Sequence, residues 1–137
     1  MGGMSAAERV YSHLQMPISL VVPAYNEQEV LPEFHRRLCA VFAALPADCE
    51  VVYVNDGSRD RTLEVMRSMR AQDERVSIVD MSRNYGKETA LTAGLDHAIG
   101  DAVVVIDADL QDPPELIPEL IAQWQEGFDV VFAKRTA

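Results

Sequence analysis

Five short apolar runs alternate along this chain with longer segments in which apolar residues recur every three or four positions. The runs are Ile18 to Val22, Val51 to Val54, Val76 to Val79, Ala102 to Ile106 and Val130 to Ala133. They are rich in β-branched residues and nearly continuously apolar, which is typical of strands covered on both faces. Strands that alternate with helices predict repeated βαβ units, an α/β fold and a mostly parallel sheet.

The segments between the runs predict four helices, each with one apolar face. The residues that mark these faces are Val30, Leu31, Phe34, Leu38, Val41, Phe42 and Leu45; Leu63, Met66 and Met69; Leu91, Leu95 and Ile99, with Gly94 among them; and Leu116, Ile117, Leu120, Ile121 and Trp124. We therefore expect helices to cover both faces of the sheet.

Two sequence patterns predict where helices begin. Asn26 with Glu29, and Asp112 with Glu115, both fit a capping box, and Pro113 would then occupy the first helical position. Asp60 is a further candidate cap for the second helix. The two capping boxes follow the first and fourth strands directly, at the carboxyl edge of the sheet, where α/β proteins bind ligands.

Composition limits the classes of partner. The chain has 137 residues, enough for one domain, and a formal net charge of −10. That charge argues against nucleic acid or an anionic membrane as the partner of this surface, because both require clustered Lys and Arg. No apolar run approaches the ~18 residues of a membrane helix, and we expect the chain to be cytoplasmic.

The cysteines and histidines predict no special chemistry. Cys39 and Cys49 lack the CxxC spacing of a metal site, so we expect two reduced thiols without a metal. His13, His35 and His97 are scattered, and we expect them at the surface.

An acidic segment at the end of the fourth strand is the strongest functional signal. Asp107, Asp109 and Gln111 alternate along an extended segment, so their oxygens can face one region. Carboxylate and amide oxygens suit Mg²⁺ or Mn²⁺, which substrate phosphates often share. The alternative is that the strand simply ends in an acidic turn. Asp112 we assign to the helix cap and not to the metal.

Three further strand ends carry candidate donor-binding residues. Asp56 could accept a hydrogen bond from the edge of a nucleobase, or it could be an ordinary turn residue before Gly57. Tyr25 offers an aromatic face for a base, whereas Glu27 in the first helical turn is explained equally well by the helix dipole. Lys87, like Arg83, could face a diphosphate, although a solvated loop needs no ligand.

Together these strand ends predict a site for a nucleoside diphosphate at one edge of the sheet. A metal held at the fourth strand would bridge the two phosphates and neutralise charge as the sugar bond breaks. The combination is much less expected by chance than any one of its members.

These residues resemble the inverting glycosyltransferases of family 2, which have the GT-A fold. The resemblance spans nearly the whole chain from Ile18 onward and rests on Pro23 to Glu27, Asn55 to Thr62, and Asp107 to Asp109. Ser82 to Gly100 and the run Asp107 to Pro114 are similar, more narrowly, to polyprenyl-phosphate sugar transferases, which include dolichol-phosphate mannose synthases.

The resemblance implies roles for these residues. Pro23, Tyr25, Glu27, Val54 and Asp56 would line the nucleoside pocket, and Asp107, Asp109 and Gln111 would surround the metal and diphosphate, with Lys87 and Ala108 added to the donor-binding set. It also implies transfer of the sugar, with inversion, to a lipid phosphate at the cytoplasmic face of the inner membrane. Uridine as the base is an expectation of the same kind.

The resemblance also implies a division of the protein. Residues 1–16 are expected to be a tag remnant and N-terminal extension, and residues 17–137 the donor-binding part of a truncated GT-A domain. The acceptor site and the catalytic base are then expected outside this chain, which would bind donor and cation weakly and turn over poorly. A homo-oligomer is possible.

Two other classes of protein compete with this interpretation. A phosphoacceptor receiver domain has a similar length and parallel strands, and would use Asp80 and Lys134, but it requires an acidic pair after the first strand, where Pro23 and Ala24 stand. A non-catalytic nucleotide-binding module remains open as a second class. A dinucleotide oxidoreductase is excluded because no GxGxxG follows the first strand.

Overall fold

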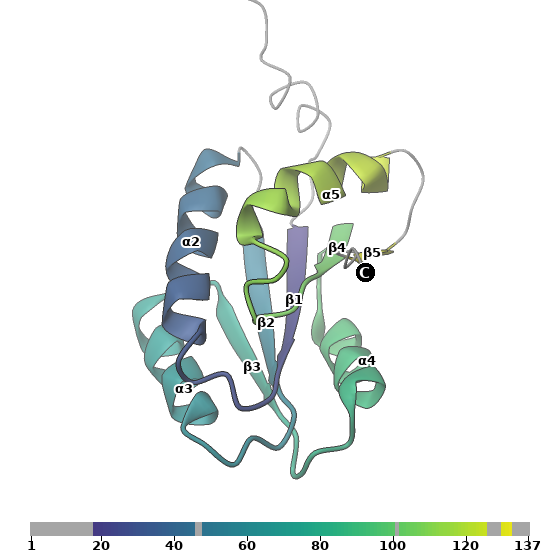
Figure 1. The fold of residues 1–137 in the computed structure, drawn as a ribbon. Helices are drawn as coiled ribbons and strands as arrows, with labels where there is room; N and C mark the ends of the chain where they lie inside the picture. The colour runs from purple at the N-terminus through teal and green to yellow at the C-terminus, as the bar shows by residue number, and fades with distance from the viewer. Residues whose placement is uncertain (1–17, 46–47, 101, 126–129, 133–137) are drawn as a thin grey trace, which may run out of the picture.

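A computed structural model describes residues 18–45, 48–100, 102–125 and 130–132. Strands and helices alternate through these residues, and η1 is a single 3-10 turn (Figure 1). The elements are β1 Ile18–Ala24, α2 Leu31–Ala44, β2 Cys49–Asn55, α3 Thr62–Gln72, β3 Val76–Asp80, α4 Lys87–His97, β4 Ala102–Val105, η1 Pro114–Leu116, α5 Ile117–Gln125 and β5 Val130–Phe132. Each predicted strand is confirmed, although β4 ends at Val105, one residue before the predicted end, and Ala133 lies outside the described residues.

The strands of the described residues form one parallel sheet with the order β3-β2-β1-β4-β5. Each neighbouring pair is parallel, as predicted. The chain adds β2 and then β3 on one side of β1, and afterwards adds β4 and β5 on its other side. The direction in which strands are added therefore reverses between β1 and β4. In doubly wound sheets this switch point is where a ligand finds a crevice between diverging loops.

The same strand order decides against the receiver domain. Receiver-type folds have the order 2-1-3-4-5, which places the third strand beside the first. Here β3 pairs with β2 at the edge of the sheet, and β4 occupies the place beside β1. The receiver hypothesis is therefore wrong.

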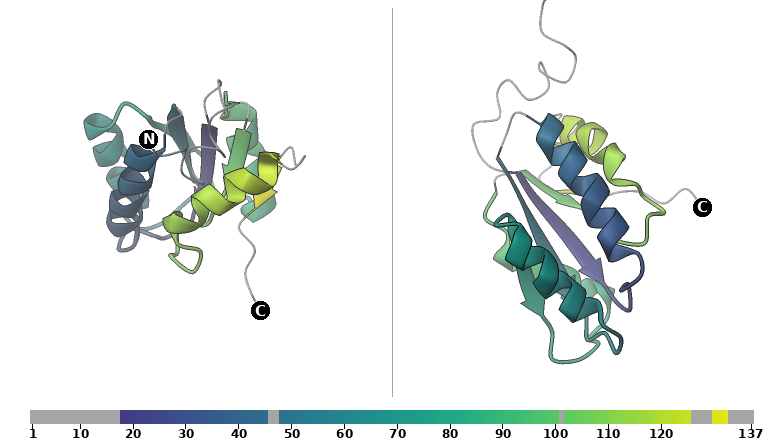
Figure 2. Two further views of the ribbon diagram at one scale, coloured as in Figure 1. Left: turned by 90° about the horizontal axis from the view of Figure 1, so that it is seen from above. Right: turned by 90° about the vertical axis from the view of Figure 1, so that its left-hand side faces the viewer.

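Helices cover both faces of the sheet, as Figures 1 and 2 show. Side chains of β1 alternate between the faces: Leu20 and Val22 belong to a core shared with α2, α3 and α5, and Val21 belongs to a second core beneath α4. The larger core includes Phe34, Leu38 and other side chains of the predicted apolar faces. Ile99 was predicted on the apolar face of the third helix, but it lies beyond α4 and is 77% exposed.

Neither capping box forms. Helix α2 begins at Leu31 and α5 is preceded by η1, and in neither place does a side chain of the flanking residue cap the helix. Proline stands at the start of the η1 turn as Pro114, not as the predicted Pro113. The N-cap residue of α3 is Arg61, which makes no side-chain cap bond, so the predicted Asp60 cap lies one residue too early; Asp60 nevertheless accepts the Thr62 N–H at 2.9 Å and so satisfies a free N–H at the start of this helix.

Asp112 and Glu115 take other positions. The Asp112 side chain is 5% exposed, and among the described residues none donates a hydrogen bond to its buried Oδ2. Glu115 instead pairs with Arg37 of α2, with oxygen–nitrogen distances of 2.7 and 3.0 Å. The capping-box prediction was wrong here because a long-range ion pair holds the glutamate.

Helix α4 approaches the sheet through Gly94. A Cβ atom added there would lie 2.5 Å from Val21 Cγ1 and 2.8 Å from Val54 Cγ2. We expect Gly94→Ala to destabilise the fold by about 1–2 kcal/mol. Overpacking costs roughly 1–3 kcal/mol, and the higher helix propensity of Ala relative to Gly offsets up to about 1 kcal/mol of that cost. The urea midpoint measures this change.

A matched control separates packing from propensity in that experiment. Thr92 lies on the exposed side of α4, so Thr92→Ala changes helix propensity without adding atoms to the core. Its free energy of unfolding should stay within about 0.5 kcal/mol of wild type. A Gly94→Ala protein as stable as the control would contradict the close approach of α4 to the sheet.

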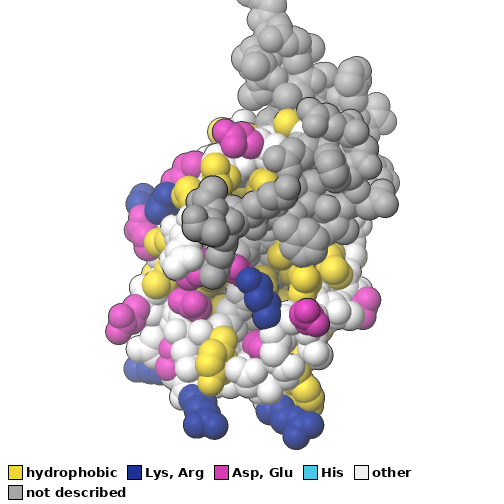
Figure 3. Space-filling view, turned by 45° about the vertical axis from the view of Figure 1, so that its right-hand side comes forward, with side chains coloured by type: hydrophobic (Ala, Val, Ile, Leu, Met, Phe, Trp, Pro, Cys, Tyr) yellow, Lys and Arg dark blue, Asp and Glu magenta, His cyan; other side chains and the backbone are white. Residues whose placement is uncertain are grey.

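The described helices contain no segment that is both long and apolar enough to cross a membrane. On the described part of the face drawn in Figure 3, acidic side chains and separate Lys or Arg side chains are interspersed.

Candidate functional site

A cleft of about 160 Å³ opens at the carboxyl edge of the sheet, where β1 and β4 diverge. Its walls come from the ends of β1, β2 and β4 and from the first residue of α4. The lining residues are Pro23, Ala24, Tyr25, Glu27, Asp56, Lys87, Asp107, Ala108 and Asp109. The structure thus brings together every predicted site residue except Val54 and Gln111.

A larger groove of about 710 Å³ lies between α2 and the η1–α5 segment. It is lined by side chains such as Ala40, Val41 and Pro118, together with the Arg37–Glu115 ion pair. Size alone would favour this groove. The smaller cleft is the better candidate because it gathers carboxylates, an ammonium group and an aromatic ring at the switch point of the sheet.

Negative charge is concentrated in the cleft. Partial burial raises the pKa of Glu27, and the neighbouring carboxylates of Asp109, Asp107 and Asp60 raise it further. Lys87 Nζ lies 2.8 Å from Asp107 Oδ2 and offsets part of this charge. Crowded carboxylates of this kind favour a bound cation, and an all-oxygen donor set suits Mg²⁺ or Mn²⁺.

A tight turn places Asp109 at the mouth of the cleft. The Gln111 N–H donates to Asp109 Oδ1 at 3.0 Å, and Leu110 between them has a φ of 64°. The Gln111 side chain is exposed and does not line the cleft. Its predicted contact with a metal therefore depends on a side chain that reaches in from the rim.

Asp56 is fixed at the base of the cleft. Its side chain is 5% exposed, its Oδ1 accepts the Tyr85 N–H at 3.0 Å, and its own N–H donates to the Ala24 carbonyl. Tyr25, by contrast, is 40% exposed and also lines the cleft. A buried carboxylate and an exposed tyrosine that line the same cleft can together recognise a nucleobase.

Val54 does not line the cleft. Its side chain is fully buried in the core beneath α4, where it faces Gly94. The predicted direct role of this side chain in the nucleoside pocket is therefore corrected: Val54 supports β2, whose end carries Asp56.

The loops after β1 and β2 hold each other in place, and this explains why Asn26 does not cap α2. Asn26 Oδ1 accepts the Arg59 N–H at 2.8 Å, and the Asn26 N–H donates to Ser58 Oγ at 3.0 Å. The Glu27 N–H donates to Thr62 Oγ1 at 2.8 Å. Reciprocal bonds between side chains and backbone thus fix the positions of Tyr25 and Glu27.

Sequence reasoning missed these supporting residues. The sequence patterns assign no individual role to Ser58, Thr62 or Tyr85. Their one sequence signal is the density of Ser, Thr, Asn and Asp in residues 55–62, since such side chains readily bond to nearby backbone. That signal does not identify the backbone groups to which these side chains bond. Those of Ser58 and Thr62 lie in the loop after β1.

Comparisons with known proteins show what this chain is similar to. Residues 19–137 match the family model described as Glycosyl transferase family 2. An uncharacterized glycosyltransferase of Bacillus subtilis (strain 168), YkcC, is 52% identical over 124 residues, which are 90% of this chain and 38% of that protein. The bactoprenol glucosyl transferase of Shigella phage SfV is 50% identical over 121 residues, 88% of this chain and 39% of that protein.

Among solved structures, the mannosyltransferase PcManGT of Pyrobaculum calidifontis, in complex with GDP-Man and Mn²⁺, is similar with a TM-score of 0.64 and 26% sequence identity. The similarity covers 85% of this chain and 37% of that one. The chain thus spans well under half the length of the relatives that it matches.

Proposed function

Because the chain belongs to glycosyl transferase family 2 and has the GT-A fold, we propose that it is the donor-binding part of an enzyme that transfers a sugar from a nucleotide-diphospho-sugar to a polyprenyl phosphate. The observation that carries this proposal is the cleft in which Tyr25, Asp56 and the carboxylates of Glu27, Asp107 and Asp109 converge. Similarity to the phage bactoprenol glucosyl transferase supports the lipid acceptor.

The nucleoside would lie between Tyr25 and Asp56. The Tyr25 ring is accessible for stacking, and the Asp56 carboxylate, held by the Tyr85 N–H, would accept a hydrogen bond from the imide of uracil. Pro23 and Ala108 form the adjoining walls. A base edge without an N–H in that position would leave a buried carboxylate poorly paired, so Asp56 would contribute to selection of the base.

The diphosphate would lie against Asp107, Asp109 and Lys87. The two aspartates, with Gln111 from the rim, would hold Mg²⁺ or Mn²⁺, which when bound neutralises the diphosphate leaving group. Lys87 Nζ already lies 2.8 Å from Asp107, within reach of the same phosphate oxygens. The negative field of Glu27 disfavours a bare diphosphate, so donor binding should require the cation.

We propose that the acceptor site and the catalytic base belong to a part of the full protein that this chain does not include. A cleft of about 160 Å³ is smaller than the ~300–1,000 Å³ of a complete small-molecule site. The matched relative is longer, with this chain spanning 38% of it. In the whole enzyme, an acceptor phosphate oxygen would attack the anomeric carbon from the face opposite the diphosphate, so the configuration inverts.

The test is a transfer assay on the full-length protein, with undecaprenyl phosphate as acceptor and UDP- or GDP-sugars as donors. We expect a lipid-linked sugar of inverted anomeric configuration, formed only with Mg²⁺ or Mn²⁺, and at the cytoplasmic face when membrane vesicles are used. The 137-residue chain should bind UDP with Mn²⁺ but form no product. Nucleotide binding by the full protein without transfer would favour the non-catalytic binding module.

A further inference from the structure

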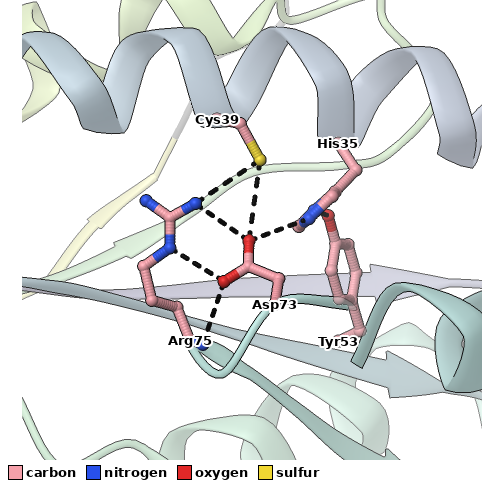
Figure 4. A network of polar contacts seen from close by, with 5 residues as sticks. All are labelled: His35, Cys39, Tyr53, Asp73 and Arg75. Atoms are coloured by element: carbon pink, nitrogen blue, oxygen red, sulfur yellow. Dashed lines mark hydrogen bonds and ion pairs between the residues drawn. The ribbon is translucent and has the colours of Figure 1, made fainter. Parts of the chain in front are cut away.

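A second cluster of metal-ligating side chains lies away from the cleft, between α2 and the turn that precedes β3. His35 and Cys39 project from α2 toward Asp73 (Figure 4). One ligand atom from each residue lies within 4.8 Å of the others. We propose that His35, Cys39 and Asp73 bind a transition-metal ion of the Zn²⁺ class, at a site separate from the proposed donor site.

The ligand chemistry separates this site from the cleft. Imidazole nitrogen, thiolate sulfur and carboxylate oxygen together suit Zn²⁺, whereas the cleft offers oxygens alone and suits Mg²⁺ or Mn²⁺. His35 and Cys39 are four residues apart on a helix, so they share one face. Three protein ligands leave a fourth tetrahedral position for water or an exogenous ligand.

The imidazole of His35 is already oriented for this role. Its Nδ1 lies 2.7 Å from the hydroxyl of Tyr53, a side chain that is fully buried. Its Nε2 points to the centre of the cluster, 3.2 Å from Asp73 Oδ2. A histidine whose second nitrogen is held by a polar group is the usual arrangement around protein-bound metals.

Asp73 is held so that one oxygen faces the cluster. Its Oδ1 accepts hydrogen bonds from the Arg75 backbone N–H at 3.0 Å and from Arg75 Nε at 2.9 Å. Its Oδ2 accepts the Cys39 thiol at 3.6 Å as well as the His35 contact. A metal at the position shared by these contacts would replace the thiol proton, which passes to solvent, and would leave the bond from the Arg75 backbone N–H to Oδ1 in place.

Arg75 is the group that must move. Its Nη2 lies 2.9 Å from Asp73 Oδ2 and 3.6 Å from Cys39 Sγ, so it competes with a cation for both ligands. Its side chain is 39% exposed and borders an open depression of about 510 Å³ that also reaches Cys39 and Asp73. Rotation of the guanidinium into this depression would admit the ion. Because this rotation breaks the hydrogen bonds of the guanidinium to Asp73, it lowers the affinity of the site for the metal.

Titration with Co²⁺, a spectroscopic substitute for Zn²⁺, tests the proposal. The wild-type chain should show thiolate-to-Co²⁺ charge-transfer absorption at one equivalent, and added Zn²⁺ should remove it. Cys39→Ser should abolish this absorption, whereas the matched variant Cys49→Ser and the cleft variant Asp109→Asn should retain it. Absorption that is missing from the wild type, or that depends on Cys49, would overturn the proposal.

A second measurement needs no variant and so does not depend on the folding of one. Zn²⁺ should slow the alkylation of Cys39 in the wild-type chain at least tenfold, as followed by peptide mass spectrometry, while the rate at Cys49 stays unchanged. Equal protection of both thiols, or protection of neither, would count against a site built on His35, Cys39 and Asp73.

Discussion

Replacing Asp109 by Asn is expected to weaken the Mn²⁺-dependent binding of UDP to this chain by roughly 100-fold, which is about 3 kcal/mol. The reason is the lost charge: Asn retains an oxygen that can accept the Gln111 N–H, now 3.0 Å from Asp109 Oδ1, so the turn should persist. Isothermal titration calorimetry with Mn²⁺, and again with EDTA, measures the difference.

The control for this experiment is Asp96→Asn. Asp96 is exposed on α4 and does not line the cleft, so the same change in formal charge is made outside it. UDP should bind this variant as it binds the wild type, because charges exposed to solvent are screened beyond about 10 Å. If both variants bound UDP equally well, Asp109 would not be a metal ligand.

Gly57→Ala is expected to lower the free energy of unfolding by about 4 kcal/mol, and the melting temperature by more than about 10 °C. Gly57 has a φ of +68°, and an added Cβ would lie 2.2 Å from the Arg83 carbonyl carbon and the Asn84 nitrogen. These are backbone atoms, so no side-chain rotation relieves the clash. The loop that donates the Tyr85 N–H to Asp56 would be displaced, and nucleotide binding should fall too.

Gly86→Ala is the comparison that isolates the clash. Gly86 also has a positive φ, of +99°, but nothing lies within 4 Å of an added Cβ. This variant should lose only the energy of backbone strain, roughly 2 kcal/mol. Thermal denaturation of the two variants in parallel decides the point, since equal losses would mean that the loops after β2 and β3 do not meet at Gly57.

The geometry of the Asp107–Asp109 segment shows why much of the site could be predicted. Strand β4 is a short apolar run that is easily recognised in the sequence. The aspartates follow directly after this strand, so they must lie at the edge of the sheet where it ends. Because carboxyl ends of parallel strands share one edge, Tyr25, Asp56 and Asp109 could be expected near one another before any coordinates. The cleft confirms that expectation.

Asn26, Val54 and His35 show where sequence reasoning failed. Asn26 fits a local capping pattern, but its side chain bonds to the backbone of residues 59 and 60. Val54 was placed in a pocket by resemblance, yet its side chain lies in the core. His35 was expected at the surface, but it contacts Tyr53 and Asp73. In the cases of Asn26 and His35, the deciding partner is more than 15 residues away in the sequence.

Local patterns along the chain are enough to predict the strands, the apolar helix faces and the edge of the sheet that carries the acidic residues. Those properties depend on periodicities of two and 3.6 residues, which are local. Which polar groups meet depends instead on the packed fold: the Asn26 side chain accepts the Arg59 backbone N–H, and the Cys39 thiol donates to Asp73. A hydrogen bond acts over about 3 Å, and chain segments distant in sequence come that close only after the core has packed.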